Sequence, residues 1–257
     1  LNGVTYGSNT FVAVGDTGRI ERSTDNGVSW SSSSSSGNNL NGIAFGNSKF
    51  IAVGDSGNLW RSTNNGASGN SYTAPYYSSH NRHLNGVAFG NSTFVAVGDS
   101  SKIIRSTNPT TQQNSWTMRC NGYHSCFGSG TRDLDGVAFG NGTFVAVGAS
   151  GRIMISNDNG VNWSGSSSGS TQLNGIAFGN GTFVAVGNSG KILRSANDGS
   201  SWSTSNSSGS NLRGVAFGNS TFVAVGERGK IIRSTDNGVS WSNSTSNTTS
   251  YLYGVTF

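Results

Sequence analysis

A short motif recurs along the whole chain and constrains the fold more than any other feature. It reads Leu-x-Gly-Val or Leu-x-Gly-Ile, and its copies begin at Leu1, Leu40, Leu84, Leu134, Leu173, Leu212 and Leu252. Leu1 and Leu40, like Leu134 and Leu173, are 39 residues apart. Repeats of this length are typical of propellers and solenoids, in which each unit packs on its neighbours. The motif predicts one domain with the repeats 1–39, 40–83, 84–133, 134–172, 173–211 and 212–251, followed by an extra strand at 252–257.

Each repeat contains four segments with the pattern of β-strands. In the fourth repeat the first strand is the run 134–139, the turn Gly140-Asn141-Gly142 follows, and the second strand is the run 144–148. Asn-Gly between apolar runs is a strong hairpin signal. A third strand of the type seen at 230–234 and a fourth that begins near Val239 complete the unit. No segment shows the 3.6-residue period of a helix.

The second strand is apolar on both faces, since Phe11 and Ala13 alternate with Val12 and Val14. A strand of this kind must be covered on both sides. Sheets packed around a ring provide that cover, whereas the coils of a linear solenoid rarely contain three successive hairpins. The pattern predicts an all-β fold, a six-bladed β-propeller of four-stranded antiparallel blades. The motif at 252–257 either seals the ring beside the N-terminus or begins a seventh blade, so a seven-bladed ring is the alternative.

The composition argues against several functional classes. Charged residues make up 11% of the 257 residues and the net charge is +5, with no run of Lys or Arg, so nucleic acid is not an expected partner. The sequence has no apolar run near the roughly 20 residues that cross a bilayer, so membrane insertion is not expected. Nothing in the sequence implies a cofactor.

The two cysteines, Cys120 and Cys126, lie close together in one insertion. Two cysteines cannot form a tetrahedral metal site alone. Although His124 lies between them, a local disulfide is favoured over a metal site. A disulfide indicates an oxidising compartment, and therefore a secreted or cell-surface protein.

A second motif precedes the fourth strand in three repeats and reads Ser-Thr-Asp-Asn-Gly-Val-Ser-Trp or a close variant. Its Asp and Trp are Asp25 and Trp30, Asp158 and Trp163, and Asp236 and Trp241. The motif resembles the Asp-box (BNR repeat) of sialidase-type propellers, and the whole repeat resembles the photosystem II assembly factor family. The resemblance implies a propeller fold and a structural role for these residues, but it says little about function.

Catalytic residues do not stand out from the repeat background. Of the two glutamates, Glu21 occupies a third-strand position that is apolar in the other repeats, and Glu227 occupies a turn position that is Asp in three others. A glycosidase needs two opposed carboxylates, and the sequence has no Gly-x-Ser-x-Gly elbow. We therefore expect no catalytic site and no enzyme activity, and glycoside hydrolysis is the least favoured function.

Two insertions, 67–83 and 109–133, break the symmetry of the repeats and form the predicted binding region. Long aromatic loops on a rigid scaffold are common recognition devices. The candidate ligand-binding residues are Tyr72, Tyr76, Tyr77, His80, Arg82, Trp116, Arg119, Tyr123, His124 and Phe127. They predict a non-catalytic extracellular module that recognises a glycan or a surface protein, like a lectin or adhesin. A structural module that assembles with other subunits is the alternative. Trp116 has a second interpretation, as the displaced box tryptophan of its repeat.

A basic position near the end of the third strand is shared by five repeats: Arg22, Arg61, Arg105, Arg194 and Arg233. The turn after the second strand is polar in the same five repeats. The fourth repeat has Ile155 and Ala149 at these two positions. The correlation predicts a charge-assisted bond across a hairpin or between blades. The alternative is a ring of arginines that lines a channel for an anionic ligand.

Overall fold

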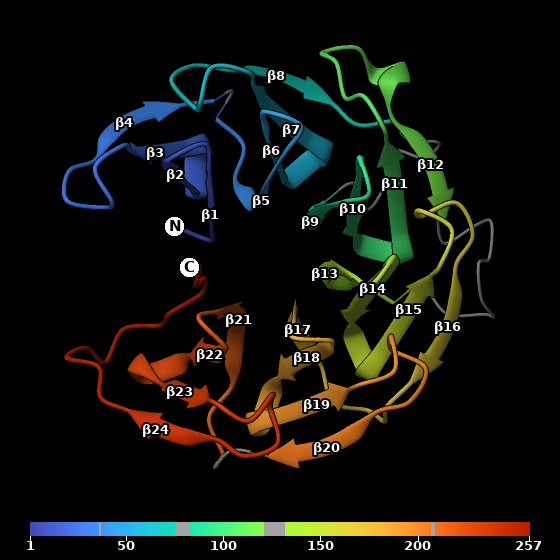
Figure 1. Cartoon of the computed structure of the whole chain (residues 1–257). Helices are drawn as coiled ribbons and strands as arrows, with labels where there is room; N and C mark the ends of the chain where they lie inside the picture. Colours follow the sequence, from blue (N-terminus) through green and yellow to red (C-terminus); the bar gives the residue numbers. More distant parts are fainter. Residues whose placement is uncertain (36, 76–82, 121–131, 207–208) are drawn as a thin grey trace.

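The computed structural model describes residues 1–35, 37–75, 83–120, 132–206 and 209–257 of the chain. This part of the chain forms six four-stranded antiparallel sheets, and its helical structure is limited to short 3-10 turns. Figure 1 shows the sheets as blades around a central axis, with β1, β5, β9, β13, β17 and β21 innermost. The predicted six-bladed β-propeller is confirmed.

Each blade takes its four strands from one repeat, in chain order from the inside to the outside. The strands of blades 1 to 3 are β1 (Gly3–Gly7), β2 (Thr10–Val14), β3 (Arg19–Ser23), β4 (Ser31–Ser34), β5 (Leu40–Gly46), β6 (Lys49–Gly54), β7 (Asn58–Ser62), β8 (Asn70–Thr73), β9 (Leu84–Gly90), β10 (Thr93–Gly98), β11 (Lys102–Ser106) and β12 (Thr117–Cys120). The strands of blades 4 to 6 are β13 (Leu134–Gly140), β14 (Thr143–Gly148), β15 (Arg152–Ser156), β16 (Ser164–Ser167), β17 (Leu173–Gly179), β18 (Thr182–Gly187), β19 (Lys191–Ser195), β20 (Ser203–Asn206), β21 (Leu212–Gly218), β22 (Thr221–Gly226), β23 (Ile231–Ser234) and β24 (Ser242–Ser244).

The turn between the first and second strands has the backbone conformation that its sequence predicts. In blade 4, Asn141 has a φ of 47° and Gly142 a φ of 79°. Positive φ at both central residues matches the right-handed twist of the flanking strands, and Asn and Gly tolerate it best. The turn sets a register that places Phe139 opposite Phe144, with ring centroids 4.7 Å apart.

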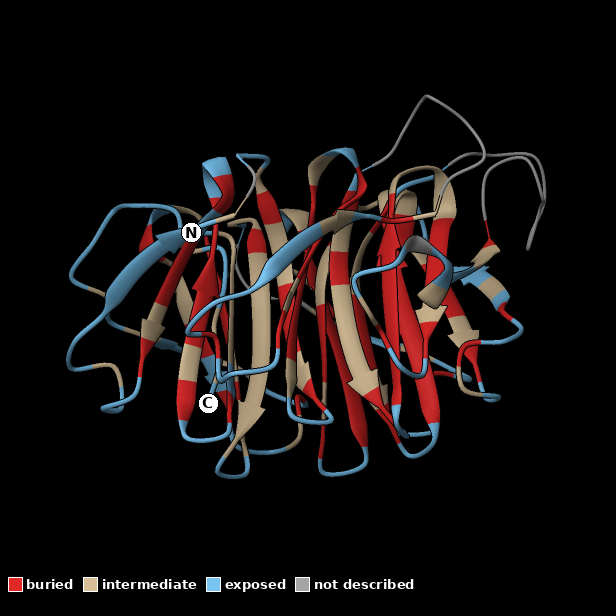
Figure 2. Ribbon diagram, turned by 90° about the horizontal axis from the view of Figure 1, so that it is seen from above, coloured by how far each residue is buried: buried red, intermediate tan, exposed pale blue. Residues whose placement is uncertain are grey.

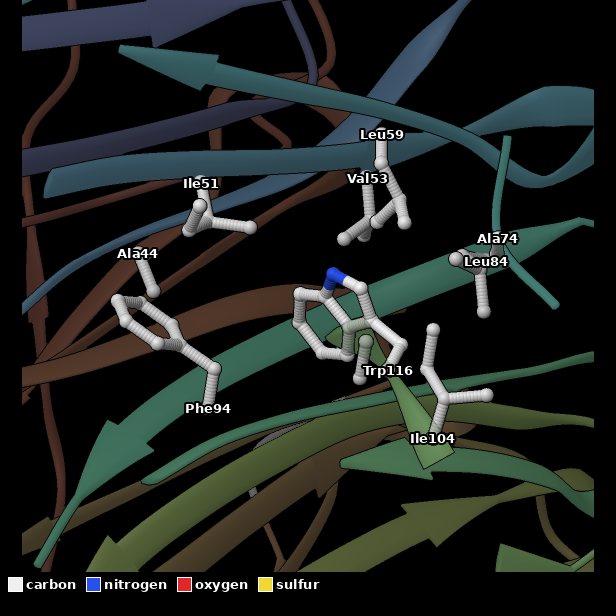
Figure 3. Close-up of a cluster of buried hydrophobic side chains, with 10 residues drawn as sticks. Ala44, Ile51, Val53, Leu59, Ala74, Leu84, Phe94, Ile104 and Trp116 are labelled. Carbon is white, nitrogen blue, oxygen red and sulfur yellow. The ribbon is translucent and has the colours of Figure 1, made fainter. Parts of the chain in front are cut away.

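The core lies between the blades. The second strand of blade 3 shows why its sequence is apolar on both faces. Phe94 joins a cluster with Ile51 and Val53 of blade 2, whereas Val95 joins Phe144 of blade 4 in another cluster. Figure 3 shows the first of these clusters, in which Phe94 lies opposite side chains of blade 2. Blades 2 to 5 therefore each bury one face against the blade before and the other against the blade after.

Five clusters of this kind join the successive blades from 1 to 6. Figure 2 shows that buried positions lie along the middle of the strands, whereas the turns at their ends are exposed. Within the described ranges, no buried apolar cluster joins blade 6 to blade 1. Figure 1 shows both ends of the chain at this sixth junction. Among the described residues, apolar packing therefore closes five junctions, and the sixth has no such cluster.

Candidate functional site

The described parts of the two insertions contribute to the core. Trp116 is 3% exposed and belongs to the cluster between blades 2 and 3 (Figure 3). Its Nε1–H donates a hydrogen bond to the hydroxyl of Tyr72 at 3.2 Å, and burial raises the pKa of Tyr72 to about 12. Trp116 is thus a core residue in this structure and not the exposed ligand contact that we predicted from its loop. Its other predicted role, as a displaced box tryptophan, fits this position.

Most of the remaining predicted binding residues lie outside the part of the chain that the structure describes. Arg119 is half-buried in β12. Tyr76, Tyr77, His80, Arg82, Tyr123, His124 and Phe127 lie outside the described residues, and their role in binding stays a prediction. Cys120 is 1% exposed at the end of β12, but Cys126 also lies outside the described residues. The disulfide therefore stays a prediction as well.

The turns before the fourth strands are held by their Asp side chains. In blade 1 the Ser23 hydroxyl donates to Asp25 at 2.7 Å, and the backbone N–H of Ser29 donates to the same carboxylate at 2.9 Å. Hydrogen bonds lower the pKa of Asp25 to about 2. The bond from the Ser29 hydroxyl has the largest effect, and the bond from the Ser29 backbone N–H has the next largest. Asp158 and Asp236 accept equivalent bonds in blades 4 and 6. These three carboxylates therefore accept hydrogen bonds within their own turns and stabilise them.

The shared arginines connect neighbouring blades. The Nε–H of Arg194 in blade 5 donates to the backbone carbonyl of Asn237 in blade 6 at 2.7 Å. Arg22 and Arg105 make the same bond to Asn65 and Asn159 of the blades that follow them. The predicted bond between blades is present, but its acceptor is a backbone carbonyl and not the polar residue after the second strand. These bonds place the three side chains between blades instead of along a central channel.

The polar residue after the second strand binds the start of its own blade. Asn41 Nδ2–H donates to Asp55 at 3.0 Å and to the carbonyl of Leu84 in the next blade at 3.0 Å. Asn2, Asn85 and Asn174 make the same pair of bonds in their blades.

Blade 4 has Asp135 where these blades have Asn, and Ala149 where they have the acceptor. Burial, with a smaller effect of Asp133, raises the pKa of Asp135 to about 7. A second carboxylate at position 149 would face Asp135 and repel it. With Ala149 at that position, the fourth repeat avoids this repulsion.

The junction between blades 6 and 1 exposes aromatic rings that the closed junctions bury. Trp30 of blade 1 is 45% exposed, whereas Trp163 of blade 4 is 7% exposed. Both indoles donate the same hydrogen bond to a turn carbonyl, at 3.0 and 3.1 Å. Phe11 of blade 1 is half-buried, whereas its counterpart Phe50 in blade 2 is fully buried. The local geometry is therefore shared, and the difference lies in the packing: Trp163 belongs to the cluster with blade 3, whereas no buried cluster among the described residues includes Trp30.

The C-terminal segment lines the same junction. Tyr251, Tyr253 and Phe257 are each 45–51% exposed, and the two tyrosine rings lie 6.3 Å apart. Together they form, with side chains of blade 1, what we call the open junction: Leu1, Tyr6, Phe11, Trp30, Tyr251, Tyr253 and Phe257. Clustered exposed apolar side chains are typical of interaction surfaces. The sequence analysis did not identify this surface, because each of these residues matches a repeat position that is buried or structural elsewhere.

The glutamates have structural partners. Glu21 lies on the face of blade 1 toward the open junction, at the position of Trp60 in blade 2. It accepts hydrogen bonds from Arg19 at 2.6 Å and from Ser32, and these bonds hold its pKa below the ordinary value. Glu227 binds Arg213 and Asn211.

Within the described residues, no group of three or more His, Cys, Asp or Glu side chains could hold a metal ion. The described part of the chain has no helix long and apolar enough to cross a membrane.

Comparisons with known proteins identify relatives of the fold. No protein-family model matches the sequence, and no curated protein matches it. Among solved structures, YCF48 from Cyanidioschyzon merolae is similar with a TM-score of 0.70 and 17% identity, over 98% of this chain and 88% of that chain. A structure of YCF48 bound to D1 peptide has a TM-score of 0.67 at 17% identity, over 92% of this chain and 77% of that chain. A chain of the nidogen/laminin complex has a TM-score of 0.63 at 14% identity, over 96% of this chain and 97% of that chain. Similarity at these identities shows the propeller fold.

Proposed function

We propose that this chain is a non-catalytic, protein-binding propeller that serves in assembly and binds a polypeptide partner through exposed aromatic side chains. The observation that carries the proposal is the exposure of Trp30, Tyr253 and Phe257, which are 45%, 48% and 45% exposed where blades 1 and 6 meet. Aromatic side chains with a polar edge are common binding anchors in protein interfaces.

The comparisons support a protein partner more than a glycan. Two of the similar structures are described as complexes, one of YCF48 with D1 peptide and one of nidogen with laminin. The box turns of Asp25, Asp158 and Asp236 fit the Asp-box resemblance, and their bonds support a scaffold role. Glycan recognition, which the sequence analysis placed ahead of assembly, depends mainly on loop residues outside the described part. Trp116, which lies in the described part, is buried.

The test is a selection of peptides from a displayed random library on the folded chain. We expect binders whose affinity falls about tenfold, or about 1.4 kcal/mol, in Trp30→Ala and in Tyr253→Ser. The matched control is Val161→Ser, because Val161 is an exposed apolar residue on the turn of blade 4, away from the junction. Binders that lose no affinity in the two junction variants would contradict the proposal. Binding on a glycan array that Tyr72→Ala abolishes would favour glycan recognition instead.

A further inference from the structure

Blade 4 differs from the other blades near the end of its third strand, where Ile155 stands in place of an arginine. In blades 1, 3 and 5 that arginine donates its Nε–H to a backbone carbonyl in the box turn of the following blade, at 2.6 or 2.7 Å. Its stem passes over the glycine of that turn, since a Cβ on Gly160 would lie 3.7 Å from Cδ of Arg105. Ile155 lies over the equivalent glycine, with its Cδ1 3.2 Å from a Cβ built on Gly199. Ile155 therefore replaces the apolar stem of the arginine but not its guanidinium.

The box turn of blade 5, which faces Ile155, is altered as well. It reads Asn197-Asp198 where the boxes of blades 4 and 6 read Asp-Asn. Asn197 holds the turn, because it accepts hydrogen bonds from the Ser195 hydroxyl at 2.9 Å and from the backbone N–H of Ser201 at 3.0 Å. The carboxylate of Asp198 is instead directed toward blade 4, where Asn141 Nδ2–H donates to it at 3.1 Å.

The junction between blades 3 and 4 shows the usual arrangement at this place. Asn91 donates to the side-chain oxygen of Asn159 at 2.6 Å, and Arg105 donates to the backbone carbonyl of the same residue at 2.6 Å. Between blades 4 and 5 the amide becomes the carboxylate of Asp198, and the carbonyl of Asp198 faces an isoleucine that has no donor. A guanidinium at this place would reach that carbonyl and lie beside the carboxylate, which is a stronger acceptor than an amide.

A pocket of about 310 Å³ opens beside Ile155 in blade 4. Its lining residues are Ile155, Asn157, Asp158, Asn162, Trp163 and Ser164. A volume at the lower end of the range for ligand pockets suits one side chain better than an oligosaccharide. Burial disfavours the charged form of Asp158, but hydrogen bonds from Asn162 outweigh it and hold the pKa of Asp158 below its ordinary value. Ile155 thus lies between two turns that each carry a carboxylate.

We propose that the outer end of the junction between blades 4 and 5 binds an arginine side chain of a partner polypeptide, whose guanidinium pairs with Asp198 where neighbouring blades use an arginine of their own. The planar guanidinium presents several donors at once, so it can bond a carbonyl and a carboxylate that lie side by side, whereas an ammonium is a compact charge without this geometry. This site is separate from the open junction and goes beyond the function proposed above, so either proposal can fail without the other.

The experiment titrates the whole ¹⁵N-labelled chain with the peptide acetyl-Gly-Arg-Gly-amide and follows the amide chemical shifts. Saturable shifts should appear in 155–164 and 197–201. Peptides with citrulline or lysine in place of the arginine should bind about tenfold more weakly, because citrulline has no charge and lysine lacks the planar donors. Asp198→Asn should weaken arginine binding about tenfold. Ile155→Arg should abolish it, because the chain then supplies its own guanidinium, and the exposed Val239→Ser is the control that should change nothing.

The junction between blades 5 and 6 allows the site to be transplanted. Arg194→Ile combined with Asn237→Asp copies the pair of Ile155 and Asp198, and should create a second arginine site with shifts in 236–240. Arg194→Ile alone removes the guanidinium but leaves a neutral amide, and should bind the peptide at that place about tenfold more weakly than the double variant.

The outcomes that overturn the proposal are distinct. They are equal affinity for the arginine and citrulline peptides, arginine binding that Ile155→Arg leaves intact, and the absence of saturable shifts around Asp198. Equal binding of the lysine peptide would make the site one for any cation and overturn its assignment to a guanidinium. In each case the aromatic surface at the open junction keeps its own test, since Trp30→Ala and Tyr253→Ser do not touch this site.

Discussion

The five closed junctions and the open one are built from nearly the same sequence, yet they bury very different side chains. Trp163 and Trp30 occupy the same position in their repeats and make the same indole hydrogen bond, but their exposure is 7% and 45%. A repeat therefore determines its own turns and hydrogen bonds, whereas the burial of its side chains depends on the adjacent repeat. In a propeller, each interface is shared by two repeats.

The largest expected effect comes from the tryptophan pair. Trp163→Ala should lower the free energy of unfolding by about 3–5 kcal/mol, because it removes a large side chain from the core between blades 3 and 4. Trp30→Ala should cost about 1 kcal/mol or less, since much of the ring is already in water. Chemical denaturation of the two variants measures both values. Equal losses of unfolding free energy in the two variants would mean that Trp30 is as buried in solution as Trp163, and would contradict the exposure of the open junction.

The second prediction concerns the closed junction between blades 4 and 5, where Asp135 replaces the asparagine of other blades. The folded state raises the pKa of Asp135 from 3.8 to about 7. Below pH 4 the carboxyl is neutral in both states, and as pH rises toward 7 the unfolded state alone loses its proton. Asp135 therefore reduces stability progressively over that range, and the loss levels off above it.

Asp135→Asn should remove this loss and stabilise the protein at pH 8 by something on the order of 2–4 kcal/mol, with little gain at pH 4. Urea denaturation at the two pH values measures the difference. Asn174→Asp is the matched control, because it introduces the same carboxyl into blade 5 and should destabilise at pH 8. A gain in Asp135→Asn that is the same at both pH values would show that Asp135 does not titrate as described.

Much of the fold was predictable because it follows from local rules. The turn at Asn141-Gly142, the two-sided second strand and the blade count all came from the repeat pattern, and the structure confirms them. The fourth repeat was harder to interpret. Its three differences from the other repeats, Asp135, Ala149 and Ile155, occur together. The sequence therefore could not show that the residue at position 149 interacts with the residue at 135 and not with the one at 155. The bond from Asn41 to Asp55 in blade 2, and its equivalents in blades 1, 3 and 5, distinguish the two possible pairs.

The proposed binding surface was not predictable in the same way. The insertions were predicted to bind a ligand because they break the symmetry of the repeats. In the part of them that the structure describes, Trp116 lies in the core. The residues of the open junction follow the repeat, and the repeat pattern alone does not distinguish the 45% exposure of Trp30 from the 7% exposure of Trp163. Two signals were nevertheless present in the first repeat: Tyr6 where five others have Phe, and Glu21 where they have apolar residues. Both lie in the one blade whose preceding face has no complete blade against it.

The third prediction compares two glycines that each lie under a phenylalanine of the next unit. A Cβ on Gly140 would collide with the ring of Phe178, which is held in the closed junction between blades 4 and 5. Gly140→Ala should therefore cost about 1–3 kcal/mol through overpacking. Gly218→Ala should cost less than about 0.5 kcal/mol, because Phe257 is 45% exposed and can turn away. Thermal unfolding of both variants provides the measurement, and equal shifts would mean that Phe257 is packed as firmly as Phe178.

The smallest expected effect comes from the arginines. Arg194→Ala should lower the free energy of unfolding by about 1–2 kcal/mol, because it leaves the Asn237 carbonyl without its charge-assisted bond. Arg233→Ala should change it by less than about 0.5 kcal/mol, since the side chain is exposed at the open junction. Denaturation midpoints measured side by side would detect the difference.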